Sequence, residues 1–291
     1  MRKLLLTLAA LAVIAAAAGW LLSAPRPLGE DAMAGLTGDA DRGAQVFHAA
    51  GCAACHAAPG AEGEARLVLA GGYRMESPFG TFIAPNISPS PQGIAGWSAL
   101  DLANALTRGV SPKGAHYYPA LPYGTYTRMT LQDVADLKVF MDGLPPSDTA
   151  SLPHEVGFPF SIRRALGLWK LLFLDDAWVR PADTPELERG RYLVEALGHC
   201  AECHTPRNPL GALDTARWLQ GAPNPSGKGK IPAINAASLG WSAEEIAYYL
   251  ESGFTPDFDS AGGEMAQVVK NTAQLTPGDR AAIAAYVKAV P

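Results

Sequence analysis

The sequence contains little cysteine and no block of like charges. Its 291 residues include four cysteines, which stand as two pairs, Cys52 with Cys55 and Cys200 with Cys203. Since each pair belongs to a short motif that ends in a histidine, no cysteine remains for a disulfide. The 23 basic and 28 acidic residues give a formal net charge of −5. Without a basic patch, nucleic acid is not expected as a partner.

Long apolar runs are also scarce, and the one that exists lies at the amino terminus. The run Leu4 to Leu22 follows two basic residues. A helix of that length spans about 28 Å, close to the thickness of the hydrocarbon core. Cleavage after Ala24 would place Pro25 behind the scissile bond, which signal peptidase does not normally accept. We therefore expect residues 1–25 to be an inner-membrane anchor that leaves the rest of the chain in the periplasm. The alternative is a cleaved signal and a soluble periplasmic protein.

No run alternates between polar and apolar residues clearly enough to predict a sheet. The chain instead contains the same unit twice. Arg42-Gly43 lies ten residues before the first cysteine pair, and Arg189-Gly190 lies eleven before the second. Further on, Gly96-Trp97-Ser98 returns as Gly240-Trp241-Ser242. We therefore expect an all-α protein with two tandem domains.

The two expected domains are residues 37–145 and 185–291. Each closes with an amphipathic helix entered through a threonine suited to cap it, Thr130 or Thr276. Residues 146–184 form an inter-domain connector. Its apolar stretch, Phe158 to Leu174, is expected to pack between the domains, or else to contact membrane or a membrane subunit. Short helices are expected at residues 41–50, 98–108, 130–142, 187–197, 242–252 and 277–289.

Each cysteine pair forms a Cys-x-x-Cys-His motif. Covalent attachment of haem needs two thiols that reach the vinyl groups of one porphyrin and an adjacent imidazole that binds the iron. A thioredoxin-like pair needs no such histidine, and a zinc site would have to combine cysteines from different copies. We therefore expect two covalently bound haem c groups with iron. The residues expected to hold them are Cys52, Cys55 and His56 for the first and Cys200, Cys203 and His204 for the second.

The second axial ligand of each iron must come from further along the chain. Met265 is the one methionine after Met141, and it stands in a glycine-rich stretch before the last helix. We expect it to ligate the second iron. In the first copy Met129 directly precedes the capping threonine and is the preferred ligand, with His116 and Met75 as alternatives.

Other residues are expected to support the haems rather than to ligate iron. The indole N–H groups of Trp97 and Trp241 are suited to donate to a haem propionate, although each side chain could equally be ordinary core. The turn Thr205-Pro206-Arg207 could present a carbonyl to Nδ1 of His204, because iron-bound imidazoles need their other nitrogen hydrogen-bonded. Arg207 would then face either a propionate or solvent.

Longer motifs resemble those of a known family, namely Pro78-Phe-Gly80, Pro85-Asn-Ile87, Tyr118-Pro-Ala-Leu-Pro-Tyr123, Gly198 to Arg207 and Gly263 to Val269. From about residue 37 to its end the sequence is similar to the multihaem cytochrome c subunits of periplasmic dehydrogenases. The resemblance implies class I cytochrome c domains that take electrons from a quinoprotein or molybdenum-type alcohol or aldehyde dehydrogenase. Two departures stand out. Leu121 occupies a position where many relatives have methionine, and the third motif of three-haem members does not follow the second one here.

The expected function is electron transfer, because two axial ligands leave each iron no open position for a substrate. We expect a periplasmic dehydrogenase subunit as electron donor. An oxidase, a quinone or another cytochrome of the respiratory chain is the expected acceptor. The alternative is a catalytic dihaem enzyme, peroxidase-like or thiosulfate-oxidising, since Leu121 makes an open position conceivable at the first iron.

Overall fold

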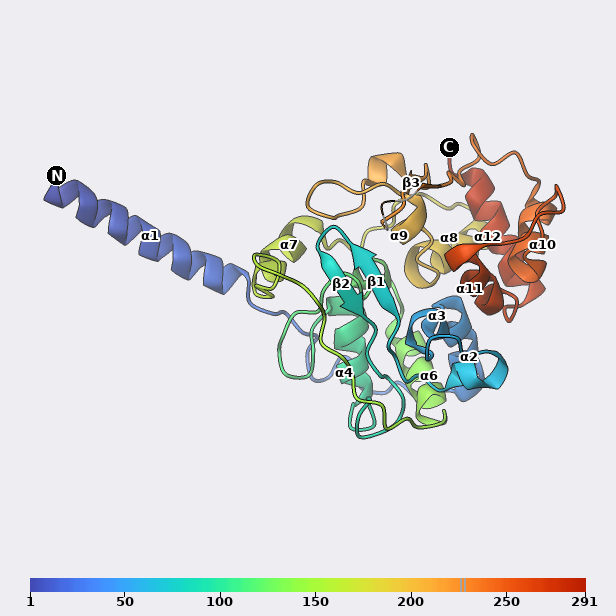
Figure 1. Ribbon diagram of the computed structural model, residues 1–291, viewed down its shortest axis with the longest axis horizontal. Coiled ribbons are helices and arrows are strands. Elements are labelled where there is room, and N and C mark those ends of the chain that lie inside the picture. Colours follow the sequence, from blue (N-terminus) through green and yellow to red (C-terminus); the bar gives the residue numbers. More distant parts are fainter. Residues whose placement is uncertain (226, 228) are drawn as a thin grey trace.

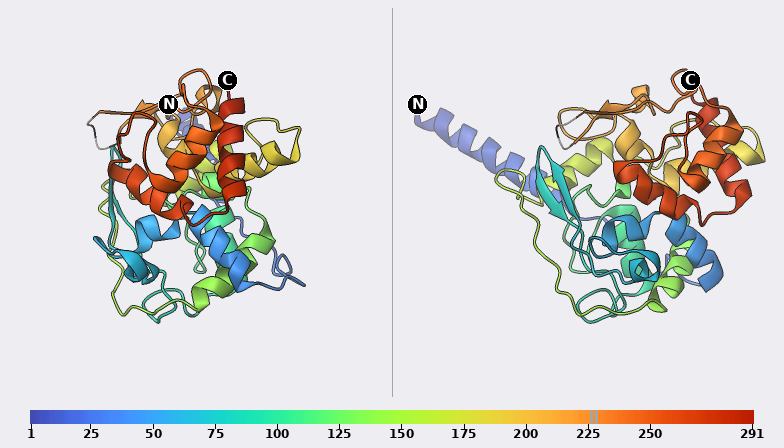
Figure 2. Two further views of the ribbon diagram at one scale, coloured as in Figure 1. Left: turned by 90° about the vertical axis from the view of Figure 1, so that its right-hand side faces the viewer. Right: turned by 45° about the vertical axis from the view of Figure 1, so that its right-hand side comes forward.

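The computed structural model describes residues 1–225, 227 and 229–291. One long helix, α1, projects from a body in which the second copy of the repeat lies beside the first (Figures 1 and 2). The first copy and its connector contain α2 (Ala40–Ala49), α3 (Cys52–His56), α4 (Ala99–Ala103), α5 (Tyr123–Tyr126), α6 (Leu131–Asp142) and α7 (Ala165–Phe173). The second copy contains α8 (Pro185–Tyr192), α9 (Ala201–His204), α10 (Ala243–Ser252), α11 (Gly263–Thr272) and α12 (Pro277–Ala289), while α1 covers Arg2–Leu22. Short 3₁₀ or π-helical turns are η1 (Gly63–Leu67), η2 (Asn104–Arg108), η3 (Leu193–Leu197) and η4 (Thr215–Arg217).

All six helices expected from the sequence are present, with ends within two residues of the expected ones when α4 is counted together with η2 and α8 together with η3. The capping threonines explain this accuracy for the last helix of each copy. The Thr130 side chain accepts a hydrogen bond from the backbone N–H of Asp133 at 3.1 Å, and Thr276 does the same for Asp279. Such caps satisfy an N–H group that the helix leaves without an internal partner.

The protein also contains two short β-hairpins, so the expectation of no sheet is wrong in detail. Strands β1 (Arg74–Ser77) and β2 (Gly80–Ile83) pair antiparallel, and β3 (Ala222–Pro223) pairs in the same way with β4 (Lys230–Ile231). Strands of four and two residues are too short to show a polar and apolar alternation. Each hairpin lies between a Cys-x-x-Cys-His motif and the helix that follows it in the same copy.

The first and last helices of each copy cross in close contact, α2 with α6 and α8 with α12. A glycine makes each crossing possible. A Cβ atom added to Gly43 would lie 2.1 Å from the carbonyl oxygen of Asp136, and one added to Gly190 would lie 2.0 Å from that of Ala282. The repeated glycine of the two Arg-Gly pairs is therefore a packing requirement.

The arginine of each Arg-Gly pair binds the last helix of its own copy. Arg42 Nε donates to Asp136 Oδ2 at 2.8 Å, and Arg189 Nε donates to Asp279 Oδ1 at 2.7 Å. In both pairs the guanidinium also donates to the second carboxylate oxygen. The Arg-Gly repeat thus fixes how the two terminal helices of each domain cross.

The apolar connector contacts both copies and the amino-terminal helix. Trp169 Nε1 donates to the carbonyl oxygen of Leu210 in the second copy at 2.9 Å, while Lys170 Nζ donates to that of Arg108 in the first at 2.7 Å. Gly167 packs against the backbone of Ser23 at the end of α1. Trp169 and Lys170 therefore each contact one of the two copies, while much of the surrounding segment is exposed.

Buried apolar side chains of the two copies form one continuous cluster. Phe47 and Leu137 of the first copy belong to it, as do Leu193 and Tyr286 of the second. Helix α11 contacts α2 and α3, and α5 contacts η3, across the boundary. This shared core holds the two cysteine motifs in a fixed relation to each other.

Candidate haem-binding sites

The first motif forms the one-turn helix α3. Cys52 and Cys55, three residues apart, lie on the same face of that turn. Gly51 precedes them in the left-handed conformation, with φ of 64°, which lets the chain enter the turn. Nδ1 of His56 lies 2.9 Å from the carbonyl oxygen of Pro85. Since a carbonyl can only accept, Nδ1 carries the proton and Nε2 keeps its lone pair for a metal.

The second motif has the same geometry around α9. Nδ1 of His204 lies 2.8 Å from the carbonyl oxygen of Pro232, and the carbonyl oxygen of His204 accepts from the N–H of Gly221 at 2.7 Å. The first copy has the matching bond from Gly71 to His56, also at 2.7 Å. Each proximal histidine is therefore fixed at both its ring and its backbone.

The expectation that the turn Thr205-Pro206-Arg207 holds the His204 ring is wrong. The acceptor is Pro232, which lies 28 residues beyond the histidine, as Pro85 lies 29 beyond His56. A repeated Pro-x-Ile motif, Pro85-Asn-Ile87 and Pro232-Ala-Ile234, was the sequence signal for this contact. Arg207 instead forms an ion pair with Glu202.

Burial affects most of the donor atoms of the two motifs, although Cys203 is exposed. Burial raises the pKa of Cys52 to about 12 and those of Cys55 and Cys200 to about 11. Burial also lowers the pKa of His56 and of His204, so both imidazoles are neutral at pH 7. Two thiols and a neutral, oriented imidazole in an apolar setting fit a covalently attached haem.

A zinc site would need several ligating side chains close together. Within residues 1–225, 227 and 229–291, no group of three or more His, Cys, Asp or Glu side chains is placed to hold a metal ion. Each copy keeps its own pair of thiols and its own imidazole, which is the arrangement that two separate haems require.

Met129 and Met265 occupy different positions in the two copies. Met129 is 5 % exposed and lies between α5 and α6 within the shared core. Met265 is half-buried, and the glycine-rich stretch that contains it is the first turn of a helix, α11. Met129 precedes the capping residue of α6 as Leu275, which is also buried, precedes that of α12.

Leu121 is the counterpart of Met265 in the loop geometry. In the first copy the N–H of Tyr117 donates to the carbonyl oxygen of Gly109 at 2.7 Å, and in the second Ala261 donates to Gly253 at the same distance. Leu121 lies four residues after Tyr117, and Met265 lies four residues after Ala261. The first copy therefore has no thioether at the position that Met265 occupies in the second.

His116 is held by groups outside the haem motifs. Its Nε2 lies 2.9 Å from the carbonyl oxygen of Ser23, and its Nδ1 lies 3.0 Å from Lys170 Nζ. His116 and Lys170 line a pocket of about 350 Å³ between the end of α1, η2 and α7. Burial lowers the pKa of Lys170 to about 7. Both ring nitrogens of His116 are thus engaged in joining the connector and α1 to the first domain.

The remaining sequence candidates lie as follows. Met75 is on strand β1, opposite Phe82. Trp97 and Trp241 are both half-buried and pack against the shared core. The ring of Trp241 is 5.2 Å from that of Tyr249. Core packing is thus the contact that the structure gives both indoles.

The two haem motifs adjoin each other across the boundary between the copies. Nε2 of His199, the residue before Cys200, lies 3.2 Å from the carbonyl oxygen of Ala50, and the hydroxyl of Tyr126 donates to the same oxygen at 3.0 Å. The Glu264 carboxylate adds to the rise in pKa of both Cys55 and Cys203. Two haems attached to these motifs would be neighbours.

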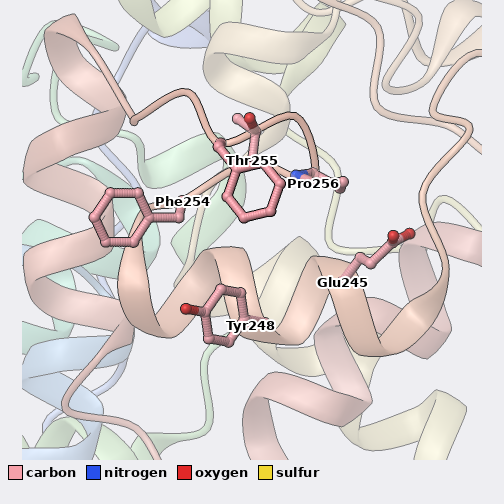
Figure 3. A pocket seen from close by; sticks show the side chains of 6 residues that line it. Glu245, Tyr248, Phe254, Thr255 and Pro256 are labelled. Atoms are coloured by element: carbon pink, nitrogen blue, oxygen red, sulfur yellow. The ribbon is translucent and has the colours of Figure 1, made fainter.

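A separate open pocket of about 320 Å³ lies on the surface of the second copy. Figure 3 shows its side chains on α10 and on the turn that follows. It is lined by Glu245, Tyr248, Phe254, Thr255, Pro256 and Phe258. The pocket contains one carboxylate among mainly aromatic and aliphatic groups and no residue of a Cys-x-x-Cys-His motif. It is therefore not a candidate haem site.

Helical domains that each present two thiols, an oriented imidazole and an apolar setting define a protein with two covalent haem sites. The sequence profile of cytochrome c matches residues 40–145 and 187–291. The chain belongs to the cytochrome c family.

Three relatives agree with this assignment. A diheme cytochrome c-type protein of Cereibacter sphaeroides is 59 % identical, over 100 % of this chain and 99 % of the relative. The fructose dehydrogenase cytochrome subunit of Gluconobacter japonicus is 39 % identical, over 86 % of this chain and 52 % of the relative. The cytochrome c subunit of alcohol dehydrogenase (quinone) from Gluconobacter oxydans is 34 % identical, over 86 % and 54 %. The chain thus spans about half the length of these two dehydrogenase subunits.

The protein is a dihaem electron-transfer cytochrome with two covalently bound haem c groups. A bound haem c supplies a one-electron couple between Fe(III) and Fe(II). The expected cofactor and the expected electron transfer are confirmed, and the relatives do not favour the catalytic alternative.

Proposed function

We propose that this cytochrome takes electrons from a periplasmic dehydrogenase and passes them to a quinone, an oxidase or another cytochrome at the inner membrane. The observation that carries the proposal is the contact between the two motifs at Ala50 and His199. It supports an electron path that enters at one haem and leaves at the other within a single rigid core. The dehydrogenase complexes named for the relatives in Gluconobacter support the class of donor.

The proposed axial ligands are His56 with Met129 for the first iron and His204 with Met265 for the second. For the first iron, three observations support Met129. Leu121 has no lone pair, His116 has both nitrogens engaged, and Met129 is buried beside the final helix. Thioether ligation raises the potential relative to two imidazoles, which suits a relay that follows a dehydrogenase.

Anchoring by α1 is part of the proposal. The helix has a mean hydropathy of 2.3 over its most apolar stretch, and no residue of that stretch is buried. It is long enough to span the bilayer. Its first two residues are the basic Arg2 and Lys3, which favours an amino terminus inside and haem domains in the periplasm. The class I type of both haem domains is also part of this proposal.

The ligand assignment is tested by replacing buried methionines with leucine. Met129→Leu should turn the first haem high-spin and remove its sulfur-to-iron absorption, while the second haem keeps its spectrum. Met141→Leu is the matched control, because Met141 is also buried in the first domain and lies on α6. An unchanged spectrum for Met129→Leu, combined with a high-spin first haem for His116→Gln, would reverse the assignment.

The electron-transfer proposal is tested in washed membranes with and without this cytochrome. Fructose, ethanol, gluconate and nicotinate form the first substrate panel, chosen from the names of the relatives. At least one dehydrogenase substrate should reduce the c-type haem and drive oxygen uptake that depends on the chain. Equal uptake with and without the chain, on this panel and on further alcohols and aldehydes, would reject the proposal.

A further inference from the structure

The connector carries a group of exposed apolar side chains beside the end of α1. Phe158 is 84 % exposed and Leu172 is 71 % exposed, which is unusual for such large apolar groups so near each other in sequence. We define the connector patch by its exposed members, Phe158, Phe160, Ile162, Leu168, Leu171 and Leu172. Helix α7 carries the last three, and its opposite side holds Trp169 and Lys170 against the haem domains.

The segment around this patch is fixed to the outer end of α1. Arg164 Nε donates to Ser23 Oγ at 2.9 Å, and its Nη2 donates to the carbonyl oxygen of Trp20 at 2.6 Å. The same guanidinium lies 4.3 Å from the centroid of the Trp20 ring. Figure 1 shows α7 directly beside the end of α1 that joins the body. A bilayer crossed by α1 therefore ends at the level of this segment.

Basic groups lie among the apolar ones. Arg163 and Arg164 precede α7, and Arg26 follows α1 and lines the pocket between the two helices. A helix with an exposed apolar side and flanking basic residues is the pattern that lies in the plane of a membrane surface. Trp20 is exposed at the same level, where an indole ring suits the interface between lipid and water.

We propose that the connector patch inserts into the outer leaflet next to α1 and fixes the orientation of the haem domains on the membrane. The inference rests on the proposed anchoring by α1. The occupant is the lipid surface rather than a protein, because the patch lies beside the end of a helix whose apolar stretch has no buried residue. With two attachment points the domains cannot swing about residue 24, so one fixed face is presented to the redox partners.

Cysteine labelling of the full-length holoprotein in nanodiscs of phosphatidylethanolamine and phosphatidylglycerol tests this inference. The four native cysteines are used in haem attachment, so one introduced cysteine is the free thiol. Leu172→Cys is compared with Val139→Cys, which lies on α6 and is 44 % exposed. A water-soluble maleimide should modify Leu172→Cys about ten times more slowly than Val139→Cys, because lipid covers the thiol.

The expected order of rates is the reverse of the order that exposure alone dictates, since Leu172 is more exposed than Val139. Equal labelling of the two variants, or faster labelling of Leu172→Cys, would overturn the inference. If Leu172→Cys were protected from the maleimide in native membranes but not in nanodiscs, the patch would bind a protein partner instead of lipid. If the holoprotein does not co-elute with nanodiscs, anchoring itself fails and the inference fails with it. Leu168→Cys provides a second test site, with a haem spectrum of each variant as the check on folding.

Discussion

The crossing of α8 and α12 gives the sharpest stability prediction. Gly190→Ala adds a Cβ atom that would lie 2.0 Å from the carbonyl oxygen of Ala282 and 2.7 Å from Cβ of Tyr286. Contacts between such atoms need more than 3 Å, so the two helices must separate by about 1 Å. The carbonyl oxygen of Ala282 is a backbone atom of a helix, so it cannot relieve the clash by a rotamer change as a flexible side chain could.

The expected magnitude is the difference between two effects. Alanine stabilises a helix interior by about 1 kcal/mol relative to glycine. Overpacking of a tight contact costs about 1–3 kcal/mol, and the separation also weakens the bond between Arg189 and Asp279. With the weakened ion pair included, we expect a net loss of about 1–2 kcal/mol in the free energy of unfolding. For a domain of this size the thermal midpoint should then fall by about 4–10 °C.

The assay is thermal unfolding of the oxidised holoprotein, followed by circular dichroism and by the haem absorption. Gly124→Ala is the matched control, because Gly124 lies on the short helix α5 and an added Cβ would meet nothing within 4 Å. That variant should keep or slightly raise the midpoint. A Gly190→Ala midpoint equal to that of the control would show that the crossing is loose and that this reasoning is wrong.

Two further predictions concern buried carboxylates. The Arg42 guanidinium holds the pKa of Asp136 below its ordinary value, so the stability that this pair contributes is present above about pH 4 and is lost as the pH falls through the folded-state pKa. Asp136→Asn should therefore lower the denaturation midpoint at pH 7 and differ little from the native protein near pH 2; a constant difference would contradict this. Glu195 is fully buried and accepts hydrogen bonds from the backbone of Val179 at 2.6 Å and from Tyr286. Glu195→Gln should lower the free energy of unfolding by about 1–3 kcal/mol in urea titrations, and an unchanged midpoint would show that the amide replaces the carboxylate fully.

The features that the sequence determined by itself are local ones. Haem attachment is readable because two thiols and an imidazole occupy five consecutive residues, and one helical turn is enough to bring them together. The six longer helices are readable because their apolar spacing and their caps, such as Thr130 and Thr276, act within a few residues. The Arg-Gly repeat can also be recognised in the sequence, but its role in the helix crossings depends on the tertiary structure.

Tertiary structure decided whatever depends on distant residues. The carbonyls of Pro85 and Pro232 reach the proximal histidines from almost thirty residues away, so the neighbouring turn was the wrong choice. The two hairpins are not predictable from the sequence, because strands this short have no clear alternation of polar and apolar residues.

The relation between the two haem motifs was likewise beyond the sequence. Their contact at Ala50 and His199 exists because both copies share one core, and no pattern within either copy encodes that docking. The same holds for His116, whose bonds to Ser23 and Lys170 bring together three segments that lie far apart in the chain. Local chemistry thus fixed which cofactor the chain carries, while long-range packing fixed how the two cofactor sites and the connector are arranged.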